Sequence, residues 1–407
     1  MLGLPLRGVR VVDFTWQGAG PFTTKALADH GAEVVRIESS RRLDGLRSMG
    51  PYRDGIKGLE RSGYFANRNS NKRDFALNLK HPAARDLALR LIAQSDIVAN
   101  NFGPGTMEAL RLAYDDVRAV RPDVIYLAMS VNGSYGPERD EVGYGLTVSS
   151  RTALHYLCGL PDRLPVGTGT NYPDHVAAPC HATFAVLAAL RHRRRTGQGQ
   201  YIDLSQAETM IALLGPAILD CSANGRVPTR QGNRDAAAAP SGVYLCAGAD
   251  RWLALSVATD AQWRALADEL DAPEWTTDPR FATLVARHQH HDALDAAIAA
   301  RTRDREPYAL MDALLRRGVP AGVMQTAEDL VERDPQLRFR GHFARLDHPE
   351  MGPSLYDAPP FRLQGVAEPI MRTPAPLVGQ HTREICRERL GLADAEIDRL
   401  IADEVLL

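Results

Sequence analysis

One carboxylate, Asp174, is the side chain of this sequence best placed for chemistry. It lies in Asn171-Tyr172-Pro173-Asp174-His175, where Pro173 biases the preceding residue toward an extended conformation. Apolar residues then recur at helical spacing, at Ala177, Phe184, Leu187 and Leu190. We therefore expect Asp174 at the N-cap of a helix, where backbone N–H groups and the helix dipole favour its ionised form. Such an anion is a candidate nucleophile for an acyl group, although an aspartate at this position is usually only a cap.

A glycine-rich turn near the N-terminus is a second candidate site. Gly18 and Gly20 precede a predicted helix, and Glu38 follows about 20 residues later, as in dinucleotide-binding turns. Thr23 occupies the position of the third glycine, so the match to a nicotinamide site is weak. A tight turn with close helix packing explains the same residues.

Further along the chain, an Asn-Phe-Gly turn and a set of cations have the residue types that bind cofactors. Residues 101–105 read Asn-Phe-Gly-Pro-Gly and follow a predicted strand, at the end where doubly wound sheets bind ligands. They suit a purine or a pantetheine chain, or form only a strand-to-helix turn. The cations are candidates for phosphate binding or for a solvated surface: Arg68, Lys72, Arg73 and Lys80.

The histidines give weaker indications. His288 and His291 share a predicted helix face, but no companion ligand motif accompanies them, so we expect no metal. His155 and His175 have the chemistry of general bases, yet no serine or cysteine nucleophile motif accompanies them.

Composition excludes several classes of protein. The chain has 407 residues, 48 basic and 50 acidic, which does not indicate nucleic acid as a partner. Its five cysteines form no Cys-x-x-Cys pair, which favours a reducing cytoplasm over a disulfide framework. We see no secretory signal, and the longest apolar run is too short to cross a membrane, so we expect a cytoplasmic protein without membrane contact.

Strands and helices alternate over the first half of the sequence. We expect strands at 9–14, 32–37, 96–100, 124–129 and 201–204, and helices at 19–30, 82–93, 107–112, 150–157 and 174–190. This alternation predicts an α/β fold with a mostly parallel, doubly wound sheet. A smaller α/β unit follows, with strands at 242–246, 252–257 and 321–325 and helices at 260–270, 287–300 and 306–317. The end of the chain, 376–404, is predicted to be helical.

An ordered set of short strings resembles the family III CoA-transferases, the CaiB/BaiF family that includes formyl-CoA transferase and α-methylacyl-CoA racemase. The resemblance runs through nearly the whole chain, and no single string is decisive. The strings are residues 5–13, 19–21, 27–34, 67–72, 101–105, 196–200, 278–281, 318–322, 334–336 and 379–382.

The resemblance implies an interlocked homodimer in which each chain threads through the other. It also implies a Rossmann-like large domain built from N- and C-terminal segments, with a smaller α/β domain in the middle. We expect residues 1–220 to form the first part of the large CoA-binding domain and 221–335 to form the small domain with its linkers. Residues 336–407 are then the C-terminal segment that returns to the large domain.

The resemblance also assigns residues. Asp174 aligns with the nucleophilic aspartate of the family, which attacks acyl-CoA and carries CoA as a thioester. The positions that align with CoA contacts are Gln17, Leu77, Lys80, Asn101, Phe102 and Gly103. Coenzyme A is thus expected as the acyl-CoA substrate, with neither metal nor NAD required.

Four positions depart from the family pattern. Gly18 and Gly145 replace a Gln and a Glu near the nucleophile of formyl-CoA transferase, which suggests a wider pocket and a bulkier acid than formate or oxalate. Ala109 replaces an arginine that contacts CoA there, which leaves Arg111 as a phosphate partner. Tyr144 replaces the histidine base of the racemase branch and is a much weaker base at neutral pH.

We therefore expect an acyl-CoA:carboxylate CoA-transferase that acts through an aspartyl intermediate on a bulky acyl substrate. Two alternatives stay open. One is an acyl-CoA racemase or isomerase of the same family. The other is a non-catalytic CoA-binding subunit of a heteromeric transferase, since some members of the family pair with a related subunit.

Overall fold

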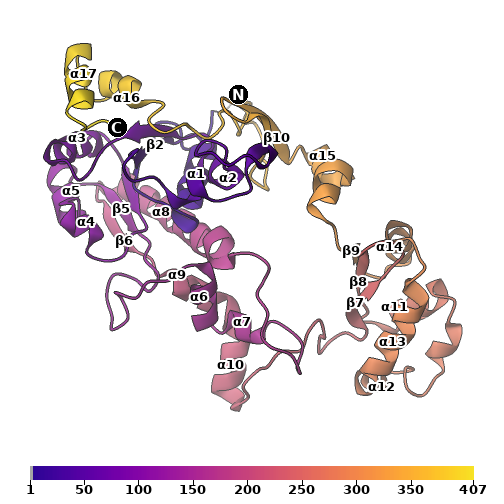
Figure 1. Cartoon of the computed structure of the whole chain (residues 1–407). Helices are drawn as coiled ribbons and strands as arrows, with labels where there is room; N and C mark the ends of the chain where they lie inside the picture. Colours follow the sequence, from indigo (N-terminus) through magenta and orange to yellow (C-terminus); the bar gives the residue numbers. More distant parts are fainter. Residues whose placement is uncertain (1–2) are drawn as a thin grey trace. The chain divides into compact units, whose positions relative to one another are not determined.

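The computed structural model describes residues 3–407, which form two compact units (Figure 1). The first unit comprises the chain up to His155 together with Gly167–Pro228 and Leu337–Leu407. The second comprises Tyr156–Val166 and Thr229–Gln336. Each unit has its own sheet and its own apolar core, so each is described separately.

The first unit is built on six parallel strands in the order β3-β2-β1-β4-β5-β6. The strands are β1 (Arg10–Asp13), β2 (Glu33–Glu38), β3 (Arg73–Ala76), β4 (Ile97–Asn100), β5 (Ile125–Ala128) and β6 (Gln200–Asp203). The chain runs outward from β1 to β3 and then returns to place β4 on the other side of β1. Ligands of such sheets bind beyond the carboxyl ends of the strands at this reversal point. The predicted doubly wound sheet is confirmed.

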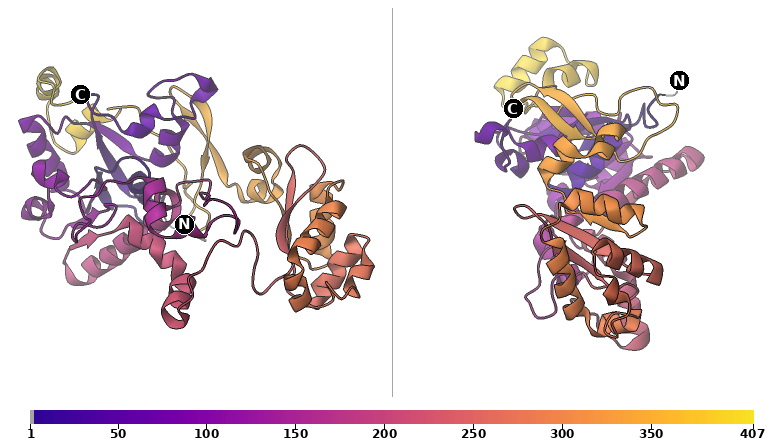
Figure 2. Two further views of the ribbon diagram at one scale, coloured as in Figure 1. Left: turned by 60° about the horizontal axis from the view of Figure 1, so that its bottom comes forward. Right: turned by 90° about the vertical axis from the view of Figure 1, so that its right-hand side faces the viewer.

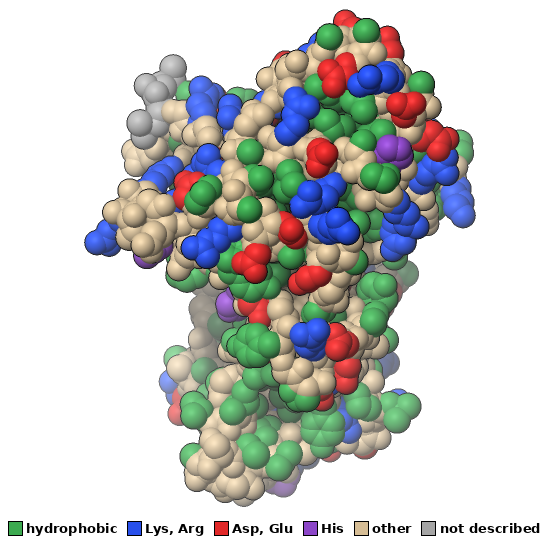
Figure 3. All heavy atoms as spheres, turned by 90° about the vertical axis from the view of Figure 1, so that its left-hand side faces the viewer, with side chains coloured by type: hydrophobic (Ala, Val, Ile, Leu, Met, Phe, Trp, Pro, Cys, Tyr) green, Lys and Arg blue, Asp and Glu red, His purple; other side chains and the backbone are tan. Residues whose placement is uncertain are grey.

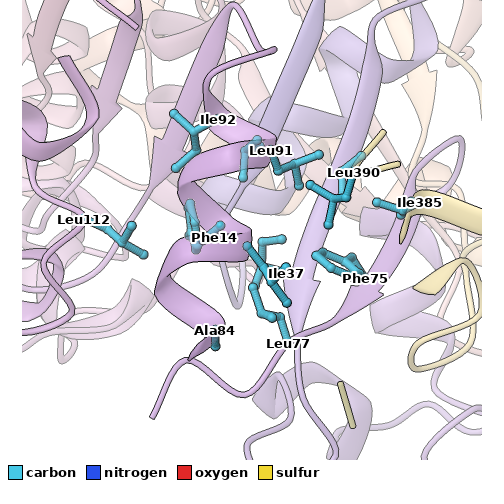
Figure 4. Close-up of a cluster of buried hydrophobic side chains, with 14 of the residues drawn as sticks. Phe14, Ile37, Phe75, Leu77, Ala84, Leu91, Ile92, Leu112, Ile385 and Leu390 are labelled. Carbon is cyan, nitrogen blue, oxygen red and sulfur yellow. The ribbon is translucent and has the colours of Figure 1, made fainter. Parts of the chain in front are cut away.

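Helices cover both faces of this sheet. One face packs on α1 (Ala19–Asp29) and α8 (Ala178–Thr196), which supply residues such as Leu27 and Val186 to one buried cluster. The other face packs on α3 (Pro82–Ile92), α5 (Tyr114–Val120), α16 (Thr382–Glu388) and α17 (Asp394–Ala402). Figure 4 shows Ile385 and Leu390 of the C-terminal segment beside Phe75 and Leu91. The C-terminal segment therefore packs into the same apolar core as the strands and helices of the N-terminal part of the chain.

Further short elements belong to this unit or lie at its boundaries with the second unit. They are α2 (Gly63–Asn69), α4 (Thr106–Ala109), α6 (Gly145–Arg151), α7 (Leu154–Leu157), α9 (Gln206–Ile211), α10 (Gly215–Asn224), α15 (Pro335–Arg340), β10 (Phe343–His348) and β11 (Gly352–Asp357). Strands β10 and β11 form an antiparallel hairpin (Figure 2). Its Tyr356 packs in one cluster with Phe65 of α2, so the hairpin helps to hold α2 in place.

The second unit has a three-stranded antiparallel sheet in the order β7-β8-β9. Its elements are β7 (Ser241–Leu245), β8 (Trp252–Ser256), β9 (Ala321–Val323), α11 (Asp260–Glu269), α12 (Leu284–Gln289), α13 (His291–Thr302) and α14 (Pro307–Arg316). The core is formed by strand residues such as Leu253 and helix residues such as Trp263 and Leu294.

Several local predictions were wrong. The helix predicted over 150–157 is two short helices, α6 and α7, because Ala153 has a positive φ of 63°. The helix predicted over 287–300 divides between α12 and α13 at His290, so His288 and His291 do not share a helix. Phe184 and Leu187, cited for their helical spacing, do lie on α8, where they are 74% and 42% exposed. Strands β3, β10 and β11 had not been predicted.

Basic and acidic side chains are interspersed on the face shown in Figure 3, as the nearly balanced charge suggests. Across residues 3–407, no helix has the length and apolar character needed to span a membrane.

Candidate functional site

A buried ion network fixes the turn after β1. The Arg36 guanidinium donates to Asp44 at 2.7 Å, and both side chains are fully buried. The second partner of that carboxylate is the backbone N–H of Gln17, 3.1 Å away. Gln17 has a left-handed φ of 65°, a conformation that a non-glycine residue keeps only when its surroundings enforce it. The network therefore holds the turn in a shape the isolated chain would not choose.

A second buried pair explains two of the predicted phosphate ligands differently. Lys72 is fully buried and donates to Asp13 at 3.1 Å and to Thr24 at 2.7 Å. Arg73 forms ion pairs with Glu33 and Glu388. Lys72 is neutralised inside the protein, and Arg73, whose side chain is 21% exposed, is paired with acidic side chains nearer the surface, so both cations hold elements together.

Gly18 brings the turn into contact with Asp174. A Cβ atom at position 18 would lie 2.6 Å from the Cβ and 2.8 Å from the Cγ of Asp174. No real side chain fits at such distances, so glycine is what permits the approach. Gly20 is equally constrained, since a Cβ there would meet Thr15 at 2.4 Å. The two glycines serve close packing rather than a dinucleotide.

Asp174 itself is not the helix cap we expected. It lies within a π-helical turn, Pro173–Ala177, that precedes α8, and no backbone N–H of residues 3–407 donates to its carboxylate. Burial therefore dominates and raises its pKa to about 6, while the nearby Arg68 lowers it. The prediction that capping favours the ionised form was wrong: desolvation outweighs the local dipole. Asp174 is a carboxylate of raised basicity in a partly buried site.

Three side chains from helix α2 and from the Asp174 turn form the wall around this carboxylate. The Tyr64 hydroxyl lies 2.8 Å from His175 Nε2. Burial and the Arg68 charge lower the pKa of His175 to about 4, so it is neutral at pH 7. The Arg68 guanidinium lies 4.3 Å from the centre of the Phe22 ring and is itself buried. His175 thus serves as a hydrogen-bonding neighbour of Tyr64 rather than as a charged group.

The space beside Gly145 is occupied. A Cβ at this position would lie 2.5 Å from the Asn171 Cγ, so the amide of Asn171 fills the room that a larger residue would take. The neighbouring Tyr144 is 69% exposed and lines the same cavity as Asp174. The two family departures at Gly18 and Gly145 therefore accommodate Asp174 and Asn171, and do not by themselves create open volume.

Two cavities meet at the carboxyl edge of the sheet. The first, the Asp174 cavity, has a volume of about 880 Å³, and its lining includes Gln17, Gly18, Tyr64 and Asn101. The second, the Lys80 cavity, has a volume of about 1330 Å³ and is lined by Leu77, Lys80, Arg41 and Ala109, among others. Both include Trp16, Arg42, Phe102, Gly103 and Pro104 in their walls. The shared wall makes them neighbouring parts of one cleft.

The predicted CoA contacts divide between these cavities. Leu77 and Lys80 line the Lys80 cavity, Gln17 and Asn101 line the Asp174 cavity, and Phe102 and Gly103 line both. The Asn101 amide is already engaged, since it donates to the carbonyl of Trp16 at 2.7 Å and accepts from its N–H at 2.8 Å. Its side chain thus holds the turn after β1 in place.

Sequence reasoning missed Trp16, Arg42 and Tyr64. The Trp16 ring meets Phe102 edge-to-face at 5.5 Å, and the Arg42 guanidinium lies 5.5 Å from the Trp16 ring centre. Trp16 directly precedes Gln17, so an aromatic residue within a predicted ligand turn was the available indication. Arg111, the suggested phosphate partner, has a left-handed backbone conformation with a φ of 54°. Arg41 and Arg42, rather than Arg111, are the arginines that line the Lys80 cavity.

The remaining candidates serve the structure. Glu38, which would bind a ribose in a dinucleotide site, is fully buried between Arg47 at 3.0 Å and Arg36 at 3.4 Å. His291 pairs with Asp295 at 3.0 Å in the second unit. Among residues 3–407, no group of three or more His, Cys, Asp and Glu side chains is arranged to hold a metal ion.

Fold and site together define an α/β protein with a desolvated carboxylate in the cleft at the reversal point of its sheet. Residues 6–382 match the model of CoA-transferase family III, and the chain belongs to this family. It is a CoA-transferase, as the predicted resemblance implied.

Similar proteins cover nearly all of the chain. The succinyl-CoA–D-citramalate CoA-transferase of Chloroflexus aurantiacus is 33% identical over 99% of this chain and 98% of its own length. The succinyl-CoA–L-malate CoA-transferase beta subunit of the same organism is 28% identical over 99% of this chain and 98% of its own length. A CaiB/BaiF family protein from Brucella suis has a similar structure, with a TM-score of 0.86 and 29% identity over 95% of this chain and all of its own.

Proposed function

We propose that this protein moves CoA between two carboxylic acids, with Asp174 carrying the exchange as a covalent intermediate. The observation that carries the proposal is the place of Asp174. It is a carboxylate whose pKa is raised to about 6, and it lies in a cavity that shares a wall with a larger, cation-lined one. Loss of solvent makes a carboxylate a stronger nucleophile, and ordered transfer keeps the thioester from water.

The first half of the reaction releases the donor acid. A carboxylate oxygen of Asp174 attacks the carbonyl carbon of the acyl-CoA, the carbon–sulfur bond breaks, and CoA leaves as a thiolate. The product is a mixed anhydride between Asp174 and the acyl group. The thiolate then attacks the Asp174 carbonyl carbon and expels the donor carboxylate with that oxygen. Asp174 is left as a CoA thioester.

The second half runs in reverse with the acceptor. The acceptor carboxylate attacks the thioester carbon and expels the thiolate, which then attacks the acceptor carbonyl. The new acyl-CoA leaves, and Asp174 recovers its carboxylate with one oxygen taken from the acceptor. Asp174 attacks as a carboxylate, so it has to be ionised at the start of each cycle. The full cycle consumes no net proton. Backbone N–H groups at the start of α1, beside Gly18, would donate to the oxyanions in this scheme.

The Lys80 cavity suits the rest of the CoA molecule. Lys80 is an exposed cation that would pair with a phosphate, whereas Arg41 in the same wall is ion-paired with Glu404. Leu77 and Phe102 offer apolar contact for the pantetheine chain. Gly103 leaves the backbone accessible between the two cavities. The thiol would then reach Asp174 past Phe102 and Gln17.

The acyl group is proposed to be bulkier than oxalate. The support is the size of the Asp174 cavity, about 880 Å³, and its apolar wall. That wall includes Leu43, Leu46, Met49, Val131 and Val142. The relatives named above act on succinyl-CoA with D-citramalate or L-malate, which are also larger than oxalate.

Assembly as an interlocked homodimer is part of the proposal, with residues 1–220 and 336–407 as the CoA-binding domain and 221–335 as the small domain. Its support is apolar surface that a lone chain leaves in water: Phe184, Leu187, Leu213 and Leu219 on and near α8 and α10 are 42–74% exposed. Pairing with a related subunit is a second candidate, because one relative is named as a beta subunit.

The proposal is tested by incubating the protein with succinyl-CoA or acetyl-CoA and a mixed pool of carboxylic acids, then detecting new CoA esters by mass. We expect esters of branched or aromatic acids to form, and Asp174→Ala to abolish them. Turnover with oxalate far above that with the larger acids would overturn the substrate assignment. Full turnover by Asp174→Ala would overturn the mechanism.

A further inference from the structure

The turn that carries Asp174 contacts helix α2 through the hydroxyl group of Tyr64. Tyr64 Oη lies 2.8 Å from His175 Nε2, the residue directly after Asp174. The two rings meet edge-on, with centres 5.9 Å apart and planes at 88°. The C-terminal side of the Asp174 position is thereby fixed to an element more than a hundred residues away in sequence.

The N-terminal side of the turn is held by the backbone of Asn171. The Asn171 carbonyl in turn accepts from the N–H of Asp174 at 3.0 Å and from the N–H of His175 at 3.1 Å. The Asn171 side chain lies against Gly145, where an added Cβ would be 2.5 Å from its Cγ. Tyr64 thus fixes the residue that follows the reacting carboxylate, and the Asn171 carbonyl holds the backbone of the turn itself.

The neutral imidazole of His175 has one ring nitrogen that donates and one that accepts. We assign the hydrogen to Nδ1, which lies 2.8 Å from Thr170 Oγ1, so that Nε2 accepts the proton of the Tyr64 hydroxyl.

We propose that Tyr64 is a positioning residue for the proposed nucleophile: its hydroxyl fixes the Asp174 turn through His175. The inference rests on the proposed function of Asp174. Tyr64 forms no bond to the reacting atoms in this scheme. It acts by keeping the carboxylate in line with the acyl carbon, where an error of about 1 Å costs about 100-fold in rate.

The test is Tyr64→Phe, which removes the hydroxyl and keeps the ring. We expect kcat for CoA transfer to fall about 10- to 100-fold, while KM for the acyl-CoA changes less than about twofold. Hydroxylamine trapping of the Asp174 acyl group should slow by the same factor. Tyr135→Phe is the matched control, because that ring is 79% exposed and lines neither the Asp174 nor the Lys80 cavity. A wild-type kcat in Tyr64→Phe, or a change confined to KM, would overturn the inference.

A second pair of variants keeps the test valid if Tyr64→Phe does not fold. His175→Gln places an amide oxygen where Nε2 accepts the bond, whereas His175→Ala removes the acceptor. We expect the glutamine variant to keep kcat within about fivefold of wild type and the alanine variant to lose about as much as Tyr64→Phe. Equal losses in both would overturn the inference.

The assay also separates this inference from the proposed function. If Asp174→Ala retains turnover, the nucleophile assignment is wrong and the positioning role falls with it. If Asp174→Ala is inactive while Tyr64→Phe and His175→Ala match wild type, only the positioning role is wrong.

Discussion

Replacing Asp174 by Asn should stabilise the protein while it abolishes transfer. Asn keeps the shape of the side chain and removes the charge that burial makes costly. The pKa of Asp174 is raised from 3.8 to about 6, which corresponds to about 3 kcal/mol of ionisation free energy lost on folding. Because the group is only partly buried, water relaxes part of this cost, and we expect a gain of about 1 to 3 kcal/mol in the free energy of unfolding near pH 8.

The sign of the pH dependence follows from the same shift. The folded state holds the Asp174 proton more tightly than the unfolded state, so this group favours folding at low pH. Its unfavourable contribution grows as pH rises above 3.8 and is complete above about 6. At about pH 5 the advantage of Asp174→Asn should therefore fall to about half of its value at pH 8.

Urea unfolding of wild type and Asp174→Asn at both pH values measures this difference. Asp86→Asn is the matched control, since its side chain is 80% exposed on α3, and it should show no comparable gain. If Asp174→Asn is no more stable than wild type near pH 8, or if its stability advantage increases toward pH 5, the interpretation of Asp174 as a desolvated carboxylate is refuted.

Three more changes probe the site. Gly18→Ala places a Cβ 2.6 Å from the Cβ of Asp174, so kcat should fall at least about 100-fold in steady-state assays, and a wild-type kcat would contradict the close approach. Arg68→Gln removes the cation that lowers the pKa of Asp174, so the acidic limb of the kcat/KM profile should move above about pH 6; Arg68→Lys should restore it in part, and an unmoved limb would count against the interaction. Lys80→Gln should raise KM for the acyl-CoA several-fold with little change in kcat, and the reverse pattern would exclude a phosphate contact.

The parallel core was predictable because its signal is local. Buried strands such as Val9–Phe14 and the helices between them show the expected periods, and alternation of the two fixes the sheet type. Strand β3 escaped this reasoning because Arg73 and Asp74, half of its four residues, are charged. Asp74 is buried near Arg36 and Arg47, partners that no local pattern reveals. The β10–β11 hairpin was also missed, although Pro349 and Gly352 mark a turn between its strands.

The sequence was sufficient to predict the key residue of the site, Asp174, but not the environment of its carboxylate. Asp174 stood out through Pro173 and the apolar segment behind it, but capping predicted a stabilised anion where the structure shows a desolvated one. The pocket width inferred from Gly145 was also unsupported, since Asn171 fills that space. Tyr64 and Arg68 were not linked to Asp174, because their contacts join segments more than a hundred residues apart.

The central claim is that Asp174 exchanges a carboxylate oxygen with the donor and acceptor acids during turnover. In the proposed cycle the acceptor leaves one carboxylate oxygen on Asp174 at every turnover. The direct measurement is to supply an acceptor acid labelled with heavy oxygen, let the enzyme turn over, and determine the mass of the peptide that contains Asp174. The account predicts label in that side chain, dependent on both acyl-CoA and acceptor. Formation of the new acyl-CoA with an unlabelled Asp174 would contradict it.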